Sequence, residues 1–343
     1  MIKKIAITSM AAFLSLSVAN AKCLDQQETK LCLGGEVAGA LQISSSDNGT
    51  TSSSHIATPG RAELTANIVL PENNGWQTEA YYTISSDSNE KLDDYRIKVS
   101  SGNVSILAGR DGIGYVKQGQ NYVTEMGSTT VGTYGDGTLL NDNNLALEYR
   151  VNENFAMRGG LSYEAYEAVA AQAEVLDSTT GAVITPAQDA INADAMALAL
   201  VAEANVAGLG FGLEFETKSY GEPADAPTGF TAPDGQTTLT VGLQYTIADK
   251  YTPYLNYGSF TQNADVTETG IDFGVDANLD VVGLTVGMEN YDSGIDGADT
   301  TSSIYLGVIA GVFGDTQVGF QYQTSTTGDI SSSETMVELY STF

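Results

Sequence analysis

The chain has little of what most catalytic and metal sites require. Its 343 residues include two cysteines and one histidine. These leave no Ser-His or Cys-His arrangement for nucleophilic catalysis and too few nitrogen and sulfur ligands for a zinc site. The sequence therefore predicts neither an enzyme nor a metal or cofactor site, and leaves open only loose binding of divalent cations by acidic loops.

Long apolar runs are absent except near the N-terminus. Lys3 and Lys4 precede an apolar stretch at 5–18, and Ala19-Asn20-Ala21 has the small residues of a signal-peptidase site. We expect 1–21 to be a signal peptide and 22–343 to form one exported domain. Past residue 21, no stretch approaches the ~18 apolar residues that a membrane-spanning helix needs.

Positive charge is also scarce. The whole chain has 14 basic and 43 acidic residues, and removal of 1–21 leaves 12 basic against 43 acidic, a net charge of −31. Nucleic-acid binding depends on clustered Lys and Arg, so nucleic acid is excluded as a partner. Such a balance favours a surface or pore that attracts cations.

The two cysteines, Cys23 and Cys32, lie nine residues apart at the start of the exported part. In an oxidising compartment this spacing favours a small disulfide loop. Its expected role is to tie down the N-terminus.

Alternating apolar and polar residues run through most of the remaining chain and predict sixteen strands. In 61–70, for example, Leu64 and Ile68 share one face while Arg61 and Glu63 share the other. The segments 209–219 and 270–277 repeat this pattern. The last segment, 335–343, ends on Phe343, as an outer-membrane barrel strand would.

Short and long connections alternate between these strands. This alternation predicts a transmembrane antiparallel β-barrel with one rim of turns and one of loops, because open sheet edges cannot face lipid. A barrel of about 16 strands would enclose an aqueous channel. The Ala-rich segment 165–175 has a composition that favours a short helix within its loop. The long connections are expected at 44–60, 86–93, 111–143, 165–192, 220–235, 262–268, 292–302 and 324–332.

All five arginines lie in the first half of the barrel, and most have the parity of the inner face. A charge on the lipid face near the midplane would cost ~2–4 kcal/mol, so parity directs these side chains inward as a basic wall. An alternative is that they pair with inner acids such as Glu63, Asp94, Glu148 and Glu164. The residues with inner parity are Arg61, Arg96, Lys98, Arg150 and Arg158.

Inner acids outnumber inner bases, which predicts a preference for cations. A reversal potential measured in a salt gradient would test this sign. The expected inner acids are Glu63, Glu79, Asp94, Glu148, Glu164, Glu214, Glu216, Asp272, Asp276, Glu289 and Glu338.

The run 105–115 with its Gly109-Arg110 pair, followed by 144–150 and 155–163, resembles the general porins of Gram-negative bacteria. The resemblance implies an inward-folded third loop after a fifth strand that ends at Gly109-Arg110. It adds Arg110 to the basic wall, places Asp136, and second Glu125, on that loop as opposing acids, and makes Phe343 a membrane-insertion signal. It also implies a homotrimer in contact with outer-membrane lipid and lipopolysaccharide.

The predicted function is an outer-membrane porin that lets small hydrophilic solutes and ions diffuse passively. The first alternative is a non-conducting surface barrel or adhesin, whose external loops bind a partner. The second is a soluble acidic β-sandwich, because such a fold shows the same alternation.

Overall fold

The computed structural model describes residues 22–26, 29–86, 94–109, 144–169, 175–176, 183–185, 191–223, 231–263, 266–313 and 315–342. Their main element is one sheet of eighteen strands. No helix long and apolar enough to cross a membrane occurs in these residues.

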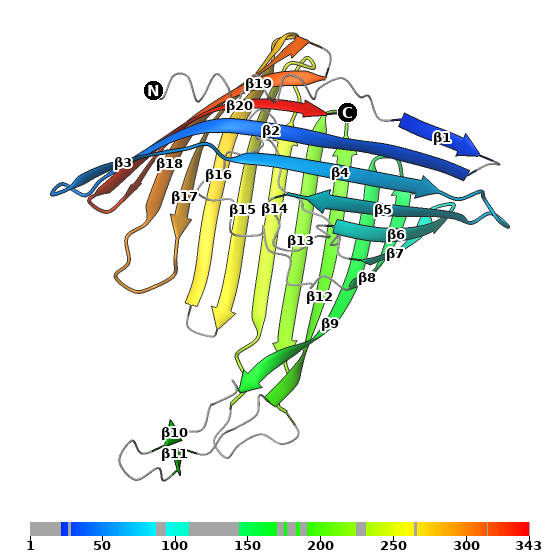
Figure 1. Cartoon of the computed structure of the whole chain (residues 1–343), viewed down its shortest axis with the longest axis horizontal. Coiled ribbons are helices and arrows are strands. Elements are labelled where there is room, and N and C mark those ends of the chain that lie inside the picture. The colour runs from blue at the N-terminus through cyan, green and yellow to red at the C-terminus, as the bar shows by residue number, and fades with distance from the viewer. Residues whose placement is uncertain are drawn as a thin grey trace.

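Sixteen of the strands form a closed antiparallel ring in chain order (Figure 1). The ring closes where the last strand pairs with the first, from Glu36 opposite Thr342 to Asp47 opposite Ser331. Its members are β2 (Thr29–Asp47), β4 (Gly60–Val69), β5 (Gln77–Ser85), β6 (Asp94–Ser101), β7 (Val104–Gly109), β8 (Asn144–Asn152), β9 (Phe155–Val169), β12 (Ile191–Val206), β13 (Leu209–Tyr220), β14 (Gln236–Tyr245), β15 (Tyr251–Asn263), β16 (Val266–Asn278), β17 (Val282–Asp292), β18 (Thr301–Phe313), β19 (Thr316–Thr327) and β20 (Ile330–Thr342).

Two more strands extend this sheet beside β2. The strand β1 (Lys22–Gln26) pairs with the start of β2, where a disulfide joins Cys23 to the directly opposite Cys32. The strand β3 (Ser52–Ala57) pairs with the end of β2. A separate pair, β10 (Val175–Leu176) and β11 (Val183–Thr185), lies away from the barrel in Figure 1.

The two faces of the strands differ as the alternation predicts. On β13, Leu213 and Phe215 are exposed on the outer face, whereas Glu214 and Glu216 are buried on the inner face. An outer band of exposed apolar side chains around a closed ring is the architecture of a transmembrane β-barrel. The fold class predicted from the sequence is thereby confirmed, and the soluble-sandwich alternative is wrong.

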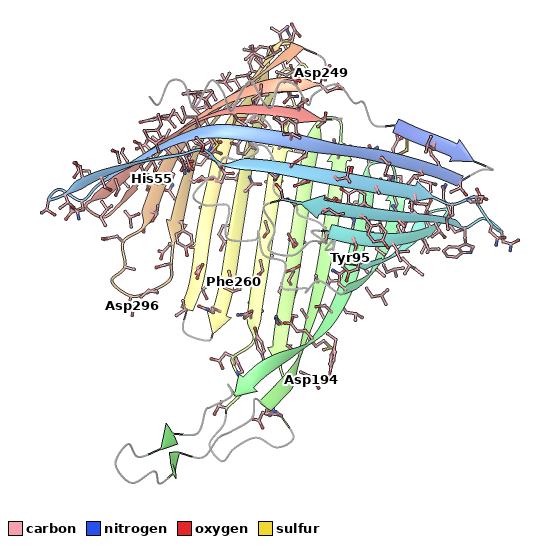
Figure 2. All side chains as sticks on the ribbon, viewed as in Figure 1. His55, Tyr95, Asp194, Asp249, Phe260 and Asp296 are labelled. Carbon is pink, nitrogen blue, oxygen red and sulfur yellow. A yellow bond between two sulfur atoms is a disulfide. The ribbon has the colours of Figure 1, made fainter. Side chains whose placement is uncertain are left out.

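The short connections lie at one end of the barrel and longer ones at the other. In Figure 2, Asp249 of the short turn before β15 lies at one end, whereas Asp296, between β17 and β18, and Asp194, near the start of β12, lie toward the opposite end. By analogy with other barrels, the end with the short turns is the periplasmic one.

Several segments expected as long loops are largely strand. β2 and β3 form a hairpin within 44–60, β15 and β16 extend into 262–268, and β19 and β20 are separated by two residues within 324–332. The helix expected at 165–175 does not form at 165–169, because these residues continue β9 and pair with β12; residues 170–174 lie outside the described residues. Beyond the bilayer the strands keep their backbone hydrogen bonds. Water on both faces removes the need for apolar residues at alternate positions, so the sequence pattern no longer marks the strand.

Candidate pore wall

The inner face of β4 to β9 carries the basic side chains that parity directs inward. Arg61 lies on β4, Arg96 and Lys98 on β6, Arg150 on β8 and Arg158 on β9. Together with Glu36, Glu63, Glu148 and Glu203 these form what we name the basic wall. Arg110, Glu125, Asp136 and Phe343 lie outside the described residues.

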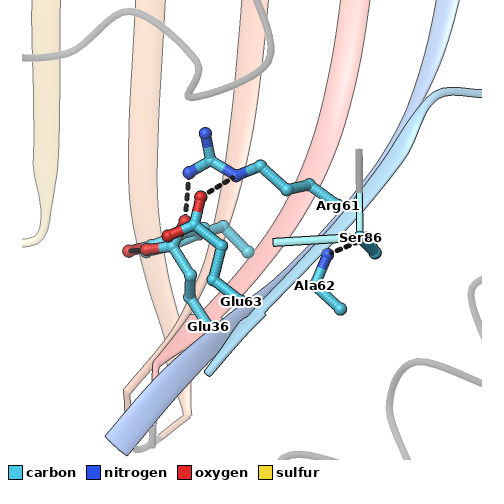
Figure 3. A network of polar contacts seen from close by, with 6 residues as sticks. Glu36, Arg61, Ala62, Glu63 and Ser86 are labelled. Carbon is cyan, nitrogen blue, oxygen red and sulfur yellow. Dashed lines mark hydrogen bonds and ion pairs between the residues drawn. The ribbon is translucent and has the colours of Figure 1, made fainter. Parts of the chain in front are cut away.

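One part of the basic wall crosses the seam where the ring closes (Figure 3). Arg61 on β4 forms an ion pair with Glu36 on β2, and its Nε lies 3.1 Å from Oε1 of Glu63. The hydroxyl of Tyr340 on β20 donates to Oε2 of Glu36 at 2.7 Å. Three adjacent strands, the first and last of the ring among them, are therefore joined by side chains as well as by backbone pairing.

A second part of the basic wall converges on Glu148. Arg158, directly opposite on β9, donates through Nε to Glu148 Oε2 at 2.8 Å, and its Nη2 lies 2.9 Å from Oε2 of Glu203. Lys98 Nζ and Arg150 Nη2 lie 3.7 and 3.6 Å from Oε1 of Glu148. A single carboxylate thus holds three cationic groups in place. This is the pairing that the sequence offered as the alternative for Arg158.

The remaining inner bases also have contacts. The guanidinium of Arg96 lies 5.5 Å from the ring centre of Tyr81, which is its cross-strand neighbour. Lys218 on β13 forms an ion pair with Glu164 on β9, across the intervening β12. The alternation places Lys218 on the inner face but not in the expected basic wall, because only the strand register shows its contact with Glu164.

The wall formed by β15 to β20 has the opposite composition. Residues 251–343 contain 13 acidic residues and no Lys, Arg or His. We name as the acidic wall Asp272, Asp276, Glu289 and Glu338, which are 0–2% exposed on inner positions of β16, β17 and β20. Asp272 and Glu289 are direct cross-strand neighbours.

Neutral donors contact the acidic wall. Asn256 Nδ2 and the Tyr305 hydroxyl donate to the two oxygens of Asp272 at 2.9 and 2.6 Å. The Thr285 hydroxyl donates to Asp276 Oδ1 at 2.6 Å. These three donors carry no charge, so their bonds do not cancel the charge of a carboxylate as the ion pairs of the basic wall do.

Two tyrosines cover two glycines in the middle of the acidic wall. Tyr254, Gly274, Gly287 and Tyr305 are successive cross-strand neighbours on β15 to β18. The tyrosine hydroxyls are hydrogen-bonded to each other, and a Cβ on Gly287 would overlap the Tyr305 hydroxyl. Glycine is therefore required beneath the rings, which lie along the wall and are almost fully buried.

The two walls differ in their exposure to solvent. The Arg150 side chain is 50% exposed and that of Glu203 34%, whereas the acidic wall is buried. Solutes that move along the inner face would therefore meet the basic wall directly. They would interact with the acidic wall through its electric field, which dissolved ions screen less because the charges are buried.

A polar pocket of about 320 Å³ lies where β2, β3, β19 and β20 meet near the end with the longer connections. It is lined mainly by serines, with His55 and Glu334. Within the residues that the structure describes, no group of three or more His, Cys, Asp or Glu side chains is arranged to hold a metal ion.

Comparison by sequence finds no relative, since neither a family model nor a curated protein matches the chain. Comparison by structure finds porins. Salmonella typhi OmpF has a TM-score of 0.67 at 12% identity, covering 94% of this chain and 100% of its own. The outer-membrane channel DcaP of Acinetobacter baumannii has a TM-score of 0.64 at 11% identity, also covering 94% and 100%.

An anion-selective porin from Comamonas acidovorans has a TM-score of 0.63 at 14% identity and covers 92% of this chain and 100% of its own. In the barrel described here, β7, which ends at Gly109, is the fifth strand and β8, which carries Arg150, is the sixth, in agreement with the resemblance found in the sequence. With its apolar outer band, the structure indicates a protein of the Gram-negative outer membrane. The chain has the closed sixteen-stranded barrel fold of the outer-membrane porins.

Proposed function

We propose that the chain is a porin-type channel through which small hydrophilic solutes and ions diffuse passively, with a preference for cations. The observation that carries this proposal is the pair of charged walls inside a closed barrel, one with mixed and paired charges and the other acidic. Charged groups fixed around an aqueous path attract one sign of ion and orient polar solutes. Catalysis is no part of this proposal.

The preference for cations rests on the balance of inner charge. The basic wall pairs its arginines with Glu36, Glu63, Glu148 and Glu203, so its net field is small. The acidic wall has no basic residue on its own strands. The Comamonas acidovorans porin has a similar fold and is anion-selective, so the sign of selectivity depends on the side chains.

The proposal includes features that lie outside the described residues. Asp136 and Glu125 would face Arg110 across the path and narrow it, and Phe343 would serve as the insertion signal. Cleavage after residue 21 would leave Lys22 as the first residue. The protein would assemble as a homotrimer surrounded by outer-membrane lipid and lipopolysaccharide, and loose divalent cations on acidic loops would be its only bound ions.

Planar-bilayer recording of the purified mature protein tests the proposal. We expect stable conductance steps, and in a potassium chloride gradient a reversal potential of the sign for cation selectivity. Clear anion selectivity would overturn only the proposed preference for cations and not the proposed channel. Absence of conductance from protein that is folded and inserted would overturn the channel, and would favour the non-conducting surface barrel.

A further inference from the structure

A notch interrupts the outer face of the barrel at Gly159. In the cross-strand row that runs from β7 to β13, Gly159 lies between Leu147 on β8 and Leu200 on β12. Ile106 and Phe215 extend the row on either side. The four large side chains are 42–63% exposed on the outer surface. Because Gly159 has no side chain, the apolar surface is recessed at this point.

The notch continues into an apolar groove of about 550 Å³. Leu145, Leu161 and Leu198, the neighbouring row, form its second margin. Among the described residues that line the groove, only Thr217 has a polar side chain. A Cβ on Gly159 would lie 3.5 Å from Leu200 Cδ2, an ordinary contact, so nothing in the backbone geometry requires glycine here. The recess itself is therefore the feature to explain.

The depth of the notch limits what can occupy it. Gly159 is the fifth residue of β9, so it lies about 13 Å along the strand from the short-turn end at ~3.3 Å per residue. With a strand tilt of about 45°, this is roughly 9 Å above the periplasmic rim, inside the apolar band. Lipid headgroups do not reach this depth, whereas acyl chains do.

The size of the groove favours an acyl chain over another protein. Twelve residues of the described part of the chain line it, whereas a stable protein interface needs about 20–30 residues on each side. Tyr149, 48% exposed on β8 two residues closer to the short-turn end than Leu147, is placed to meet the polar part of a lipid. We propose that the Gly159 notch binds one acyl chain of a phospholipid from the periplasmic leaflet.

A pair of tryptophan reporters tests this proposal. The sequence has one tryptophan, Trp76, so Trp76→Phe gives a silent background. Phe215→Trp places a reporter at the notch, and Phe273→Trp places its matched control on an outer surface far from it, since the two phenylalanines are 43% and 44% exposed. Each variant, folded in detergent, is titrated with brominated phosphatidylethanolamine.

We expect the Phe215→Trp reporter to be quenched saturably near one equivalent of lipid, and the Phe273→Trp reporter only in proportion to the bulk lipid fraction. Gly159→Leu, which fills the notch, should remove the saturable phase. If Gly159→Leu fails to fold, Leu200→Ala takes its place in the test, because a wider notch should weaken the saturable binding of lipid. Heat-modifiable migration checks folding in each case.

Equal quenching of the two reporters would overturn the proposal. The proposal would also be overturned if, without lipid, the reporter fluorescence changed with protein concentration and Gly159→Leu changed the oligomer mass. The notch would then bind a second copy of the chain. Conductance is recorded in parallel. Because the notch faces away from the channel, its loss should leave conductance unchanged, which separates this proposal from the proposed function.

Discussion

The hydroxyl of Tyr305 on β18 donates to Asp272 on β16 at 2.6 Å, across the intervening strand β17. This contact is possible because Gly287, on β17, has no side chain and so leaves room for the Tyr305 ring. The buried carboxylate is thus held by a residue two strands away. A ring laid along the wall also keeps the side chain out of the aqueous path.

Replacing Tyr305 with phenylalanine should remove one donor from Asp272 and leave the ring in place. A buried hydrogen bond to a charged group is worth about 1.5–3 kcal/mol, so we expect the barrel to unfold at lower urea. Fluorescence of Trp76 during reversible unfolding in detergent measures this. Tyr257→Phe on the outer face of β15 is the control, and an equal loss in both variants would contradict the role of the contact.

Replacing Gly287 with alanine should displace the Tyr305 ring, because the new Cβ would overlap its hydroxyl. Overpacking of this kind costs about 1–3 kcal/mol. Gly311→Ala is the matched control, since a Cβ there meets no atom within 4 Å. Urea midpoints of the two variants should therefore differ, and similar midpoints would show that the rings tolerate displacement.

Replacing Glu148 with glutamine should leave Lys98, Arg150 and Arg158 without the charge that they share. One unit charge acts on an ion about 8 Å away in water with about 0.5 kcal/mol, so we expect an approximately twofold fall in the cation-to-anion permeability ratio. Reversal potentials in a salt gradient measure it. Glu72→Gln, in the exposed turn after β4, is the control. A ratio that rises would contradict the proposed arrangement.

Replacing Asp136 with asparagine tests the constriction implied by the porin resemblance. If Asp136 faces the basic wall, single-channel recording should show a fall in cation preference of about twofold by the same estimate. Asp329→Asn, in the turn before β20, is the control for a change in net charge at a rim. Identical recordings from Asp136→Asn and wild type would remove this residue from the pore.

The sequence predicts the strands well where they cross the apolar band. There, lipid outside and water inside require apolar and polar residues in alternation. The sequence alone therefore places Leu213 on the outer face and Glu214 on the inner face, as the structure has them. Beyond the band this requirement ends, and the serine-rich segments 44–46 and 331–332 are expected in loops although they continue β2 and β20.

The side-chain contacts within each wall could not be predicted in the same way. Glu148 meets Arg158, and Tyr305 meets Asp272, only because a particular register brings these positions together. Parity gives the face of a residue but not its neighbours on the next strand. Gly274 and Gly287 are a weak indication of a ring packed against the wall, since two inward glycines on adjacent strands leave space for one. Which tyrosines fill this space follows from the strand register alone.

The short strand β1 has a consequence for assembly. β2 begins before its pairing with β20, and β1 covers the edge that remains at residues 29–33. An uncovered edge is a template for pairing with another chain. The covalent link at Cys23 and Cys32 holds this cover in place, so the disulfide would keep this edge of the folded barrel from pairing with another chain.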